Sequence, residues 1–309
     1  MDIVTHALIG ATSAAGLLAW QPELACGVVL GNVAPDLDAF SRLGGKQAFI
    51  RFHQTYTHSV AAVAFVSLAA AGLWNASQAE GSLLLLGIAI GMVMHVGLDL
   101  TNSYGVRWAW PFQRSRMALD WIFFIDLPML LWTLIGLSLV AWSWGNGTWL
   151  AWISGGYVAG MLLMIPVRGM IAARARRLAV SMSEPSGDRP PPRISVIPTT
   201  WLPWQFLVCR DWGEACVTST LDLWRGEERD VQRIPLLDDA MPGTVGELPP
   251  WQAMRDLSTF YHAVEQQTEN GHTTFVCRDL RIRNYATRFG TWTCQVDAAG
   301  QIVRSEWEV

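Results

Sequence analysis

The feature that most limits how this chain can fold is a set of long apolar runs in its first half. They lie at about residues 4–20, 24–35, 59–76, 82–100, 121–141 and 149–166. A helix needs roughly 17–25 predominantly apolar residues to cross a bilayer, and the last four runs are close to that length. A soluble protein with several buried helices is the alternative. The scarcity of charged residues before Arg168 disfavours it.

The predicted fold is mainly α: a polytopic transmembrane helical bundle followed by a smaller cytoplasmic α+β domain. We place the membrane-embedded domain at residues 1–167, a basic and proline-rich linker at 168–193, and the α+β domain at 194–309. After the linker, runs such as "QFLVCRD", "ACVTSTLDLW" and "GTWTCQVD" predict strands, and "DAAG" predicts a hairpin turn between the last two. The run "PPWQAMRDLSTFYHAVEQQ" has helical spacing and predicts one helix.

The side chains of this second half do not indicate a reaction. His262 and His272 lack acidic partners at ligand spacing, so we interpret them as ordinary core or surface histidines. The five cysteines are scattered and show no zinc-finger spacing. In a cytoplasmic domain the default for such cysteines is a reduced thiol.

Basic residues predict the orientation of the first half. They lie in alternate connections between the apolar runs and directly after the last run: Arg42, Lys46, Arg51, Arg107, Arg114, Arg116, Arg168, Arg174, Arg176 and Arg177. Connections rich in Lys and Arg stay on the cytoplasmic side of a membrane. We therefore predict a multi-pass protein of the bacterial inner membrane with both termini in the cytoplasm. The N-terminus lacks the basic flank of a signal peptide.

Ionisable residues interrupt the apolar runs, and all of them fall at the predicted cytoplasmic ends. Such groups are costly inside a membrane segment and normally face a protein interior or a wet cavity with partners. His95 and Asp99 stand four residues apart, so they project from one helix face. We expect these residues to converge on one pocket with His6, Asp36, Asp38, His53, His58, Asp120 and Asp126.

A divalent cation explains how so many carboxylates can share a pocket, because adjacent aspartates otherwise repel and take up protons. The predicted metal ligands are His6, Asp36, His58, His95, Asp99 and Asp120. Mixed imidazole and carboxylate donors suit zinc, with manganese or iron as alternatives. The donors exceed one tetrahedral shell, which indicates two or three ions, or one ion with surrounding positioning residues. Asp38 and Asp126 are the candidate catalytic bases.

Five sequence blocks resemble the YdjM-type family of membrane-bound, metal-dependent hydrolases: "MDIVTHALIG", "GNVAPDLDAF", "HQTYTHS", "HVGLDLTNSYGVRWAWPF" and "ALDWIFFIDLP". They occur in order over about the first 130 residues. One departure is Gln54, which stands where a basic residue often follows the histidine of the third block. The family is distantly similar to zinc-dependent phospholipase C and single-strand nuclease enzymes, which cleave phosphate esters. His95 and Asp99 match the HxxxD helix motif of those enzymes.

The resemblance and the residues together predict a metal-dependent hydrolase acting on a phosphate ester, such as a phospholipid or another lipid phosphate, at the cytoplasmic leaflet. Arg107, Arg114 and Arg116 are the candidate residues for binding an anionic head group. Membrane lipids are the expected partners, nucleic acid is not expected, and protein partners are unknown. The alternatives are a metal-binding membrane transporter and a regulatory or scaffolding membrane protein with a structural metal site.

Overall fold

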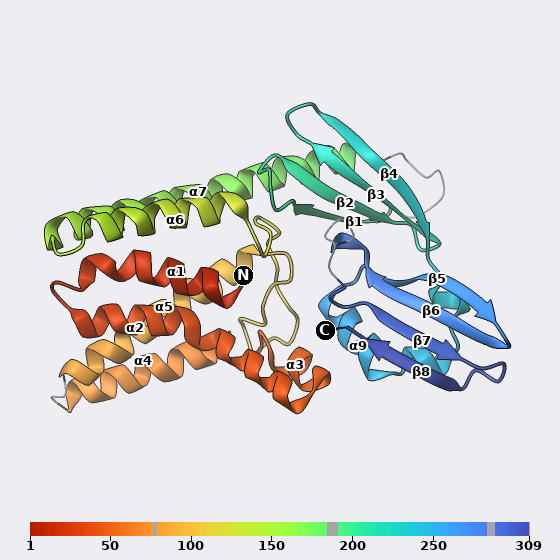
Figure 1. Cartoon of the computed structure of the whole chain (residues 1–309), viewed down its shortest axis with the longest axis horizontal. Coiled ribbons are helices and arrows are strands. Elements are labelled where there is room, and N and C mark those ends of the chain that lie inside the picture. The colour runs from red at the N-terminus through yellow and green to blue at the C-terminus, as the bar shows by residue number, and fades with distance from the viewer. Residues whose placement is uncertain (77–78, 184–190, 283–287, 309) are drawn as a thin grey trace. The chain divides into compact units, whose positions relative to one another are not determined.

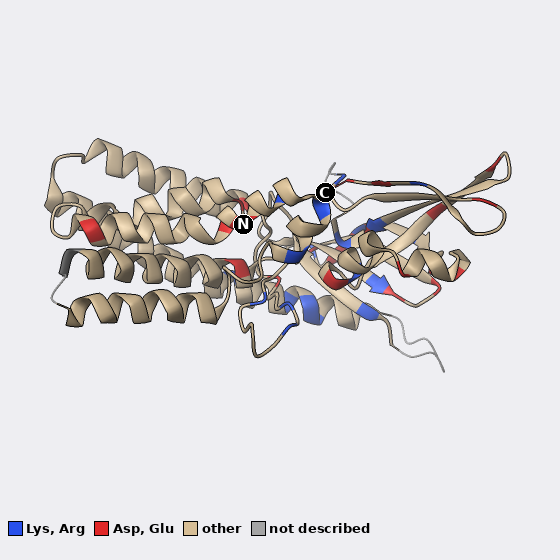
Figure 2. Cartoon of the chain, turned by 90° about the horizontal axis from the view of Figure 1, so that it is seen from below, with Lys and Arg blue, Asp and Glu red and all other residues tan. Residues whose placement is uncertain are grey.

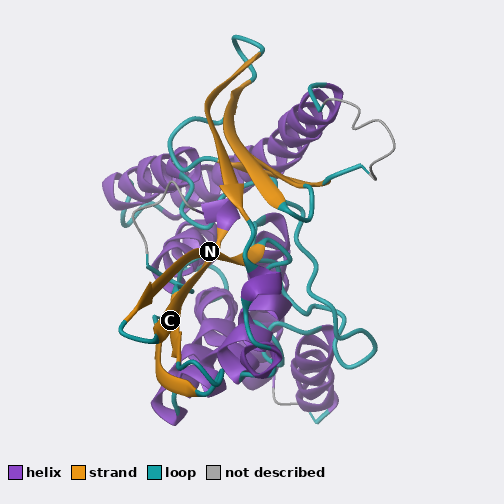
Figure 3. Ribbon diagram, turned by 90° about the vertical axis from the view of Figure 1, so that its right-hand side faces the viewer, coloured by secondary structure: helices purple, strands orange, loops and turns teal. Residues whose placement is uncertain are grey.

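The structure, a computed structural model of the whole chain, describes residues 1–76, 79–183, 191–282 and 288–308. These residues form two compact units. Unit 1 comprises Met1–Ile171 and Thr199–Pro203, and unit 2 comprises Ala172–Pro198 and Trp204–Val309. Helices make up unit 1, whereas strands dominate unit 2, as the purple and orange elements of Figure 3 show.

Unit 1 is built from apolar helices (Figure 1). In chain order they are α1 (Ile3–Ala14), η1 (Ala15–Leu17), α2 (Pro22–Val33), η2 (Ala34–Gly44), α3 (Lys46–Phe52), α4 (Val60–Asn75), α5 (Ala79–Thr101), α6 (Leu127–Trp142) and α7 (Gly147–Ser181), whose last residues belong to unit 2. Figure 2 shows that these helices carry few charged residues along most of their length.

Two helices in the described part of the chain are long and apolar enough to cross a membrane. They span Gly81–Thr101 and Gly147–Ser181, whose most apolar 18-residue windows have mean hydropathies of 2.1 and 1.7. Three further apolar helices are shorter, at Ile3–Leu17, Val60–Asn75 and Leu127–Trp142. The structure therefore supports a helical membrane unit, while the number of its crossings stays a prediction.

Helices α2 and α5 pack with their backbones in direct contact. Each has two glycines four residues apart on the shared face, Gly27 and Gly31 in α2 and Gly87 and Gly91 in α5. A Cβ atom on any of them would lie 2.1–2.4 Å from a carbonyl oxygen of the other helix, which leaves no room for a side chain. Small residues at this spacing allow apolar helices to approach closely. The contact is important because α2 leads into Asp36 and α5 carries His95.

The segment before α6 differs from the sequence prediction. Residues 121–126 were expected to begin an apolar helix with Asp126 inside it, but they lie in an irregular loop. Helix α6 begins at Leu127, where Pro128 stands in the first turn and Asp126 is the N-cap, accepting a 3.1 Å hydrogen bond from the Met129 amide. A capping carboxylate and an early proline both favour a helix start at this point.

Unit 2 contains two antiparallel sheets of four strands each. The first has the order β1 (Arg193–Pro198), β2 (Gln205–Asp211), β3 (Ala215–Asp222) and β4 (Glu227–Pro235). The second has the order β5 (Tyr261–Glu269), β6 (His272–Asp279), β7 (Trp292–Val296) and β8 (Ile302–Trp307). The sequence Val-Cys-Arg-Asp occurs in the second strand of each sheet, at 208–211 and 276–279. The turn after β7 confirms the predicted hairpin, because β7 and β8 pair directly.

Two predictions for unit 2 were wrong in detail. The run from Pro249 does not form one long helix. Helix α9 ends at Leu257 after nine residues, and β5 begins at Tyr261, where the chain pairs with β6. Strand β4 was missed because its residues are mostly exposed and charged, so they show no apolar alternation. The domain is therefore richer in strands than the predicted α+β fold, with short helices between the two sheets.

His262 is better connected than its sequence neighbourhood suggests. Its ring is buried, and Nδ1 lies 2.8 Å from Asp238 Oδ2 while Nε2 lies 3.5 Å from Asp211 Oδ2. Both acids are distant in sequence and come from η3 (Asp238–Ala240) and from β2. The histidine thereby joins elements of both sheets in the core of unit 2, which fits a structural role.

Candidate metal centre

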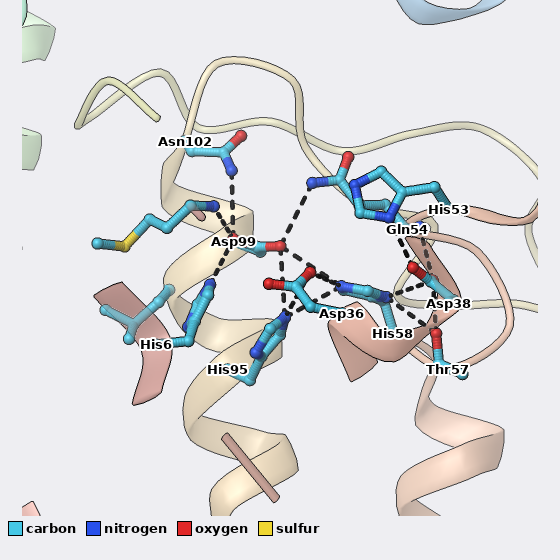
Figure 4. A network of polar contacts seen from close by, with 12 residues as sticks. His6, Asp36, Asp38, His53, Gln54, Thr57, His58, His95, Asp99 and Asn102 are labelled. Atoms are coloured by element: carbon cyan, nitrogen blue, oxygen red, sulfur yellow. Dashed lines mark hydrogen bonds and ion pairs between the residues drawn. The ribbon is translucent and has the colours of Figure 1, made fainter. Parts of the chain in front are cut away.

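Four of the predicted ligands meet at one end of unit 1. Asp36 belongs to η2, His58 to the segment before α4, and His95 and Asp99 to α5. One ligand atom from each lies within 4.8 Å of the others, and all four side chains are buried. Figure 4 shows them pointing toward one another from three different parts of the chain. The helical spacing of His95 and Asp99 supplies half of the cluster.

The two histidines approach through the same ring atom. Nε2 of His95 lies 3.0 Å from Nε2 of His58. Asp36 Oδ1 lies 3.4 Å from His58 Nε2 and 3.6 Å from His95 Nε2. Asp99 Oδ2 lies 3.6 Å from both nitrogens. Two nitrogens and two carboxylate oxygens therefore face a common point, as the donors of one cation do.

The other ring nitrogen of each histidine fixes its tautomer. His95 Nδ1 lies 2.7 Å from the carbonyl oxygen of Asn32, which can only accept, so Nδ1 carries the proton. His58 Nδ1 lies 3.2 Å from the Asp38 carboxylate, which also accepts. When these rings are neutral, both Nε2 atoms present lone pairs to each other. Only a proton or a cation between them relieves that repulsion, and a second partner on the far nitrogen is typical of metal-binding histidines.

Asp36 gives an independent indication that the centre suits a cation. Both of its carboxylate oxygens are buried and accept no hydrogen bond of normal geometry from the described residues. Buried carboxylates without a partner are rare. Burial alone would raise the pKa of Asp36, but the adjacent His58 and His95 outweigh it and hold this pKa below its usual range. The donor set therefore fits a divalent metal ion.

His58 responds to the same negative surroundings. Burial would lower its pKa, yet the close contacts with the Asp36 and Asp38 carboxylates and the nearby Asp99 charge raise the pKa of His58 to about 9. A positive charge is thus favoured at this position. A proton on His58 can supply it, and a bound metal ion would take that proton's place.

Asp38 lies beside the cluster and orients it. Its carboxylate oxygens lie 2.6 Å from His53 Nδ1, 2.7 Å from Thr57 Oγ1 and 3.0 Å from the Gln54 amide. Burial would raise its pKa, but the contacts with His53 and His58 lower the pKa of Asp38 to about 2. These donors fix the Asp38 carboxylate at 3.2 Å from His58 Nδ1, where it holds His58 in its tautomer.

His6 lies next to the four residues and not among them. Its Nε2 atom is 3.1 Å from Asp99 Oδ1, the oxygen that faces away from the cluster. Its ring stacks on that of His95 with the ring centroids 3.6 Å apart. The amino group of Met1 and the Asn102 side chain also contact Asp99 Oδ1. These groups fix one oxygen of Asp99 and leave Oδ2 directed at the cluster.

The structure does not bring Asp120 or Asp126 into the group of four. Asp126 caps α6 and forms a buried ion pair with Arg168 in α7, at 2.6 Å. Asp120 is half-buried in the loop before α6 and has a left-handed backbone conformation, with φ of 55°. The buried ion pair joins α6 to α7, so the geometry assigns Asp126 a structural contact.

The three candidate arginines lie in the loop between α5 and α6 and differ in their surroundings. Arg116 donates to the backbone oxygens of His53 and Gly105 and to Gln54 Oε1, each at 3.1–3.2 Å. It therefore fixes the turn that carries His53 and Gln54. Arg107 is half-buried, and its amide donates to the Gln54 carbonyl. Arg114 is exposed.

Sequence reasoning missed several residues that organise the centre. Asn32 holds His95 through its backbone, Gln54 approaches Asp99 Oδ2 with its side-chain amide at 3.4 Å, and Asn102 contacts the other oxygen. The amides stand within or next to the conspicuous blocks. Sequence reasoning that follows charged residues passes over these neutral side chains, although an amide near a buried acid is itself a signal.

Comparison with known proteins identifies the family. The family model of the YdjM inner membrane protein matches residues 1–172, more than half of the chain. The chain belongs to the YdjM inner membrane protein family. The YdjM match contains every residue of the metal centre, and the family is one of membrane proteins, in agreement with the two long apolar helices.

A curated relative gives less information. The "Uncharacterized protein YfhP" of Bacillus subtilis (strain 168) is 32% identical over 133 residues, which is 40% of this chain. The match spans 41% of that relative's length. No solved structure matches the chain.

Proposed function

We propose that this YdjM-family protein is a membrane-bound, metal-dependent hydrolase that cleaves a phosphate ester at the cytoplasmic leaflet. The observation that carries the proposal is the buried cluster of Asp36, His58, His95 and Asp99, in which two lone-pair nitrogens and two carboxylates face one point. A set of this composition suits a divalent ion, with zinc as the first choice and manganese or iron as alternatives. One ion fits the four residues, and a second ion would require His6 to give up its contact with Asp99 Oδ1.

A divalent ion at this position would supply a Lewis acid for a phosphoryl oxygen and would make a water molecule more acidic. The protein's own residues perform the remaining tasks. His58 and His95 are held by their far nitrogens, so their Nε2 atoms cannot turn away. His6 and Asn102 keep Asp99 Oδ1 occupied, so that Oδ2 stays directed at the centre.

His53 is the residue best placed to exchange a proton with solvent. Its side chain is about a quarter exposed, at 24%, whereas the side chains of His58 and Asp99 are fully buried. Its Nδ1 atom is held by Asp38 at 2.6 Å, which orients the ring and leaves Nε2 for proton transfer. We therefore assign the general-base role to His53 and the positioning role to Asp38, in place of Asp38 as base.

The test combines metal analysis with turnover. Purified protein should contain near-stoichiometric zinc, manganese or iron by elemental analysis. It should cleave bis-p-nitrophenyl phosphate or phosphatidic acid in mixed micelles, and a chelator should abolish the reaction. Asp36→Asn and Asp99→Asn keep the side-chain size but remove charge, so both should lose metal and activity.

Two matched variants sharpen this result. Asp120→Asn makes the same chemical change outside the group of four and should retain the metal. His53→Gln should retain the metal and lower kcat by about 100-fold or more, the usual contribution of a general base. A metal-replete protein that turned over no phosphate ester in a broad panel would instead favour the regulatory or scaffolding alternative.

The orientation is part of the proposal. The cluster end of unit 1 also carries Arg42, Lys46 and Arg51 in η2 and α3, which supports placing it at the cytoplasmic face. Both termini would then be cytoplasmic. A reporter fused to the C-terminus should behave as cytoplasmic, and alkaline phosphatase activity from that fusion would contradict the orientation.

A further inference from the structure

Helices η2 and α3 present bulky apolar and basic side chains to the outside of unit 1. Phe40 is 69% exposed and Leu43 is 89% exposed. The basic residues of the same stretch, Arg42, Lys46 and Arg51, are exposed as well. We call the outer face formed by these five residues the η2–α3 surface.

The acidic residues of the same stretch lie on its inner side. Within residues 34–52, the acidic residues are Asp36 and Asp38. Asp36 belongs to the buried cluster, and the Asp38 side chain is only 7% exposed. The segment therefore separates its charges, with the carboxylates on the inner side, in and beside the buried cluster, and the cations on the exposed side. The outer face is therefore more positive than the net charge of the segment suggests.

Aromatic contacts extend this apolar face to the neighbouring loop. The rings of Phe52 and Tyr56 lie 5.5 Å apart, and Tyr56 meets Trp110 edge-on at 4.9 Å. Two residues further on, Phe112 is 88% exposed. The loop is fastened at this end of the helices because the Trp108 carbonyl accepts a 2.7 Å hydrogen bond from the Val60 amide at the start of α4.

Water is a poor environment for such a surface. Exposed Phe and Leu side chains forgo the favourable free energy that burial of their apolar surface would give. Interleaved aromatic, apolar and basic side chains at the ends of apolar helices are typical of the membrane interface, where apolar groups enter the acyl boundary and cations meet lipid phosphates. The η2–α3 surface continues directly from α2, which packs along its length against the candidate span in α5.

We propose that the η2–α3 surface lies in the membrane interface and binds the head groups of anionic phospholipids. Its charge is complementary to such lipids, and each basic residue near an anionic surface contributes roughly 1 kcal/mol, or about fivefold local enrichment. The inference needs neither a metal ion nor hydrolysis. It holds or fails independently of the proposed reaction.

The test places a fluorescent probe on the full-length protein in proteoliposomes of phosphatidylcholine and phosphatidylglycerol. Cys26 is the exposed cysteine of the chain, so Cys26→Ala provides a background in which a new cysteine is labelled with NBD. Leu43→Cys reports on the η2–α3 surface. Leu163→Cys, on the exposed face of α7, is the bilayer control, and Ala298→Cys, in the turn after β7, is the water control.

At Leu43, a shallow lipid-borne nitroxide should quench the probe strongly and aqueous iodide should quench it weakly. Nitroxide-labelled phosphatidylglycerol should quench at least about fivefold more than its phosphatidylcholine counterpart at equal mole fraction, which is the enrichment expected from a single basic residue. The triple change Arg42→Gln, Lys46→Gln and Arg51→Gln should bring this ratio close to one while leaving the Leu163 probe unaffected.

Three results would overturn the proposal. Iodide quenching at Leu43 equal to that at Ala298 would place the surface in water. Protection from both iodide and lipid quenchers would mean that protein covers it. Equal quenching by the two labelled lipids in the unaltered surface would remove the preference for anionic head groups.

Discussion

Replacing Gly91 by alanine tests whether the close contact of α2 and α5 sets the geometry of the metal centre. Gly91 precedes His95 by one helical turn, and its added Cβ would lie 2.3 Å from the Val28 carbonyl oxygen and 2.8 Å from the Asn32 amide nitrogen. Ordinary van der Waals contact begins at about 3.4 Å. The two helix backbones must therefore separate by about 1.1 Å, which is the difference between 3.4 Å and the 2.3 Å to the Val28 oxygen.

This displacement is large for a metal site. Overpacking of this kind costs roughly 1–3 kcal/mol of stability. Metal–ligand distances tolerate only about ±0.2 Å, and the moving helix carries Asn32, whose carbonyl holds His95. We expect metal affinity to fall by about 10-fold to 100-fold, which is the range typical when a residue that orients a ligand is lost.

Gly97 provides the matched control in the same helix. A Cβ at this position meets nothing within 4 Å. Gly97→Ala should therefore keep its metal and gain roughly 0.5–1 kcal/mol from the better helix propensity of alanine. Chelator competition would give the affinities, and denaturation in detergent would give the stabilities. Wild-type affinity in Gly91→Ala, or equal damage in Gly97→Ala, would refute the reasoning.

Three further predictions concern the surroundings of the site. Asp38→Asn should weaken metal binding about 10-fold to 100-fold in chelator competition, because the contact that fixes the His58 tautomer loses its negative charge. Arg168→Met should cost roughly 3–5 kcal/mol of unfolding free energy by leaving Asp126 buried and unpaired, and adding Asp126→Asn should recover most of that loss in a double-mutant cycle. A chain truncated after Ser181 should retain the metal by elemental analysis, since the four clustered residues precede that point; loss of metal would show that unit 2, or the Thr199–Pro203 segment of unit 1 that the truncation also removes, contributes to the site.

The sequence was most informative where charge interrupted apolar runs. An imidazole or carboxylate inside such a run is costly, so the sequence predicted one pocket for nine residues, of which Asp36, His58, His95 and Asp99 form the cluster. The helix spacing of His95 and Asp99 even gave their relative direction. The family resemblance rested on the same blocks, and the match over residues 1–172 bears it out.

The division of roles could not be read from spacing alone. Asp36 and Asp38 stand two residues apart, yet one faces the cluster and the other accepts hydrogen bonds from the following turn. The 3₁₀ geometry of η2 decides this, and it depends on tertiary contacts. Asp126 looked like a buried functional acid because its partner Arg168 follows 42 residues later.

In unit 2, the secondary structure that the local sequence pattern predicts differs from the one that strand pairing produces. The residues after Leu257 have apolar spacing that suits a helix, but pairing with β6 satisfies their backbone groups in an extended conformation. The charged strand β4 is held by its hydrogen bonds to β3 and has almost no buried side chain. Edge strands of this kind carry a weak apolar signal, so sequence patterns tend to miss them.

The close contact between α2 and α5 also fixes when the metal centre can form during synthesis. The residues that could hold an ion come from η2, from the segment before α4 and from the end of α5, so the last of them emerges some 60 residues after the first. Until α5 has inserted and its glycines have met those of α2, Asp36 has no neighbouring imidazole from that helix. Metal capture would therefore be a late event of biogenesis, and a cell short of the metal would accumulate inserted chains whose acidic cluster is still uncompensated.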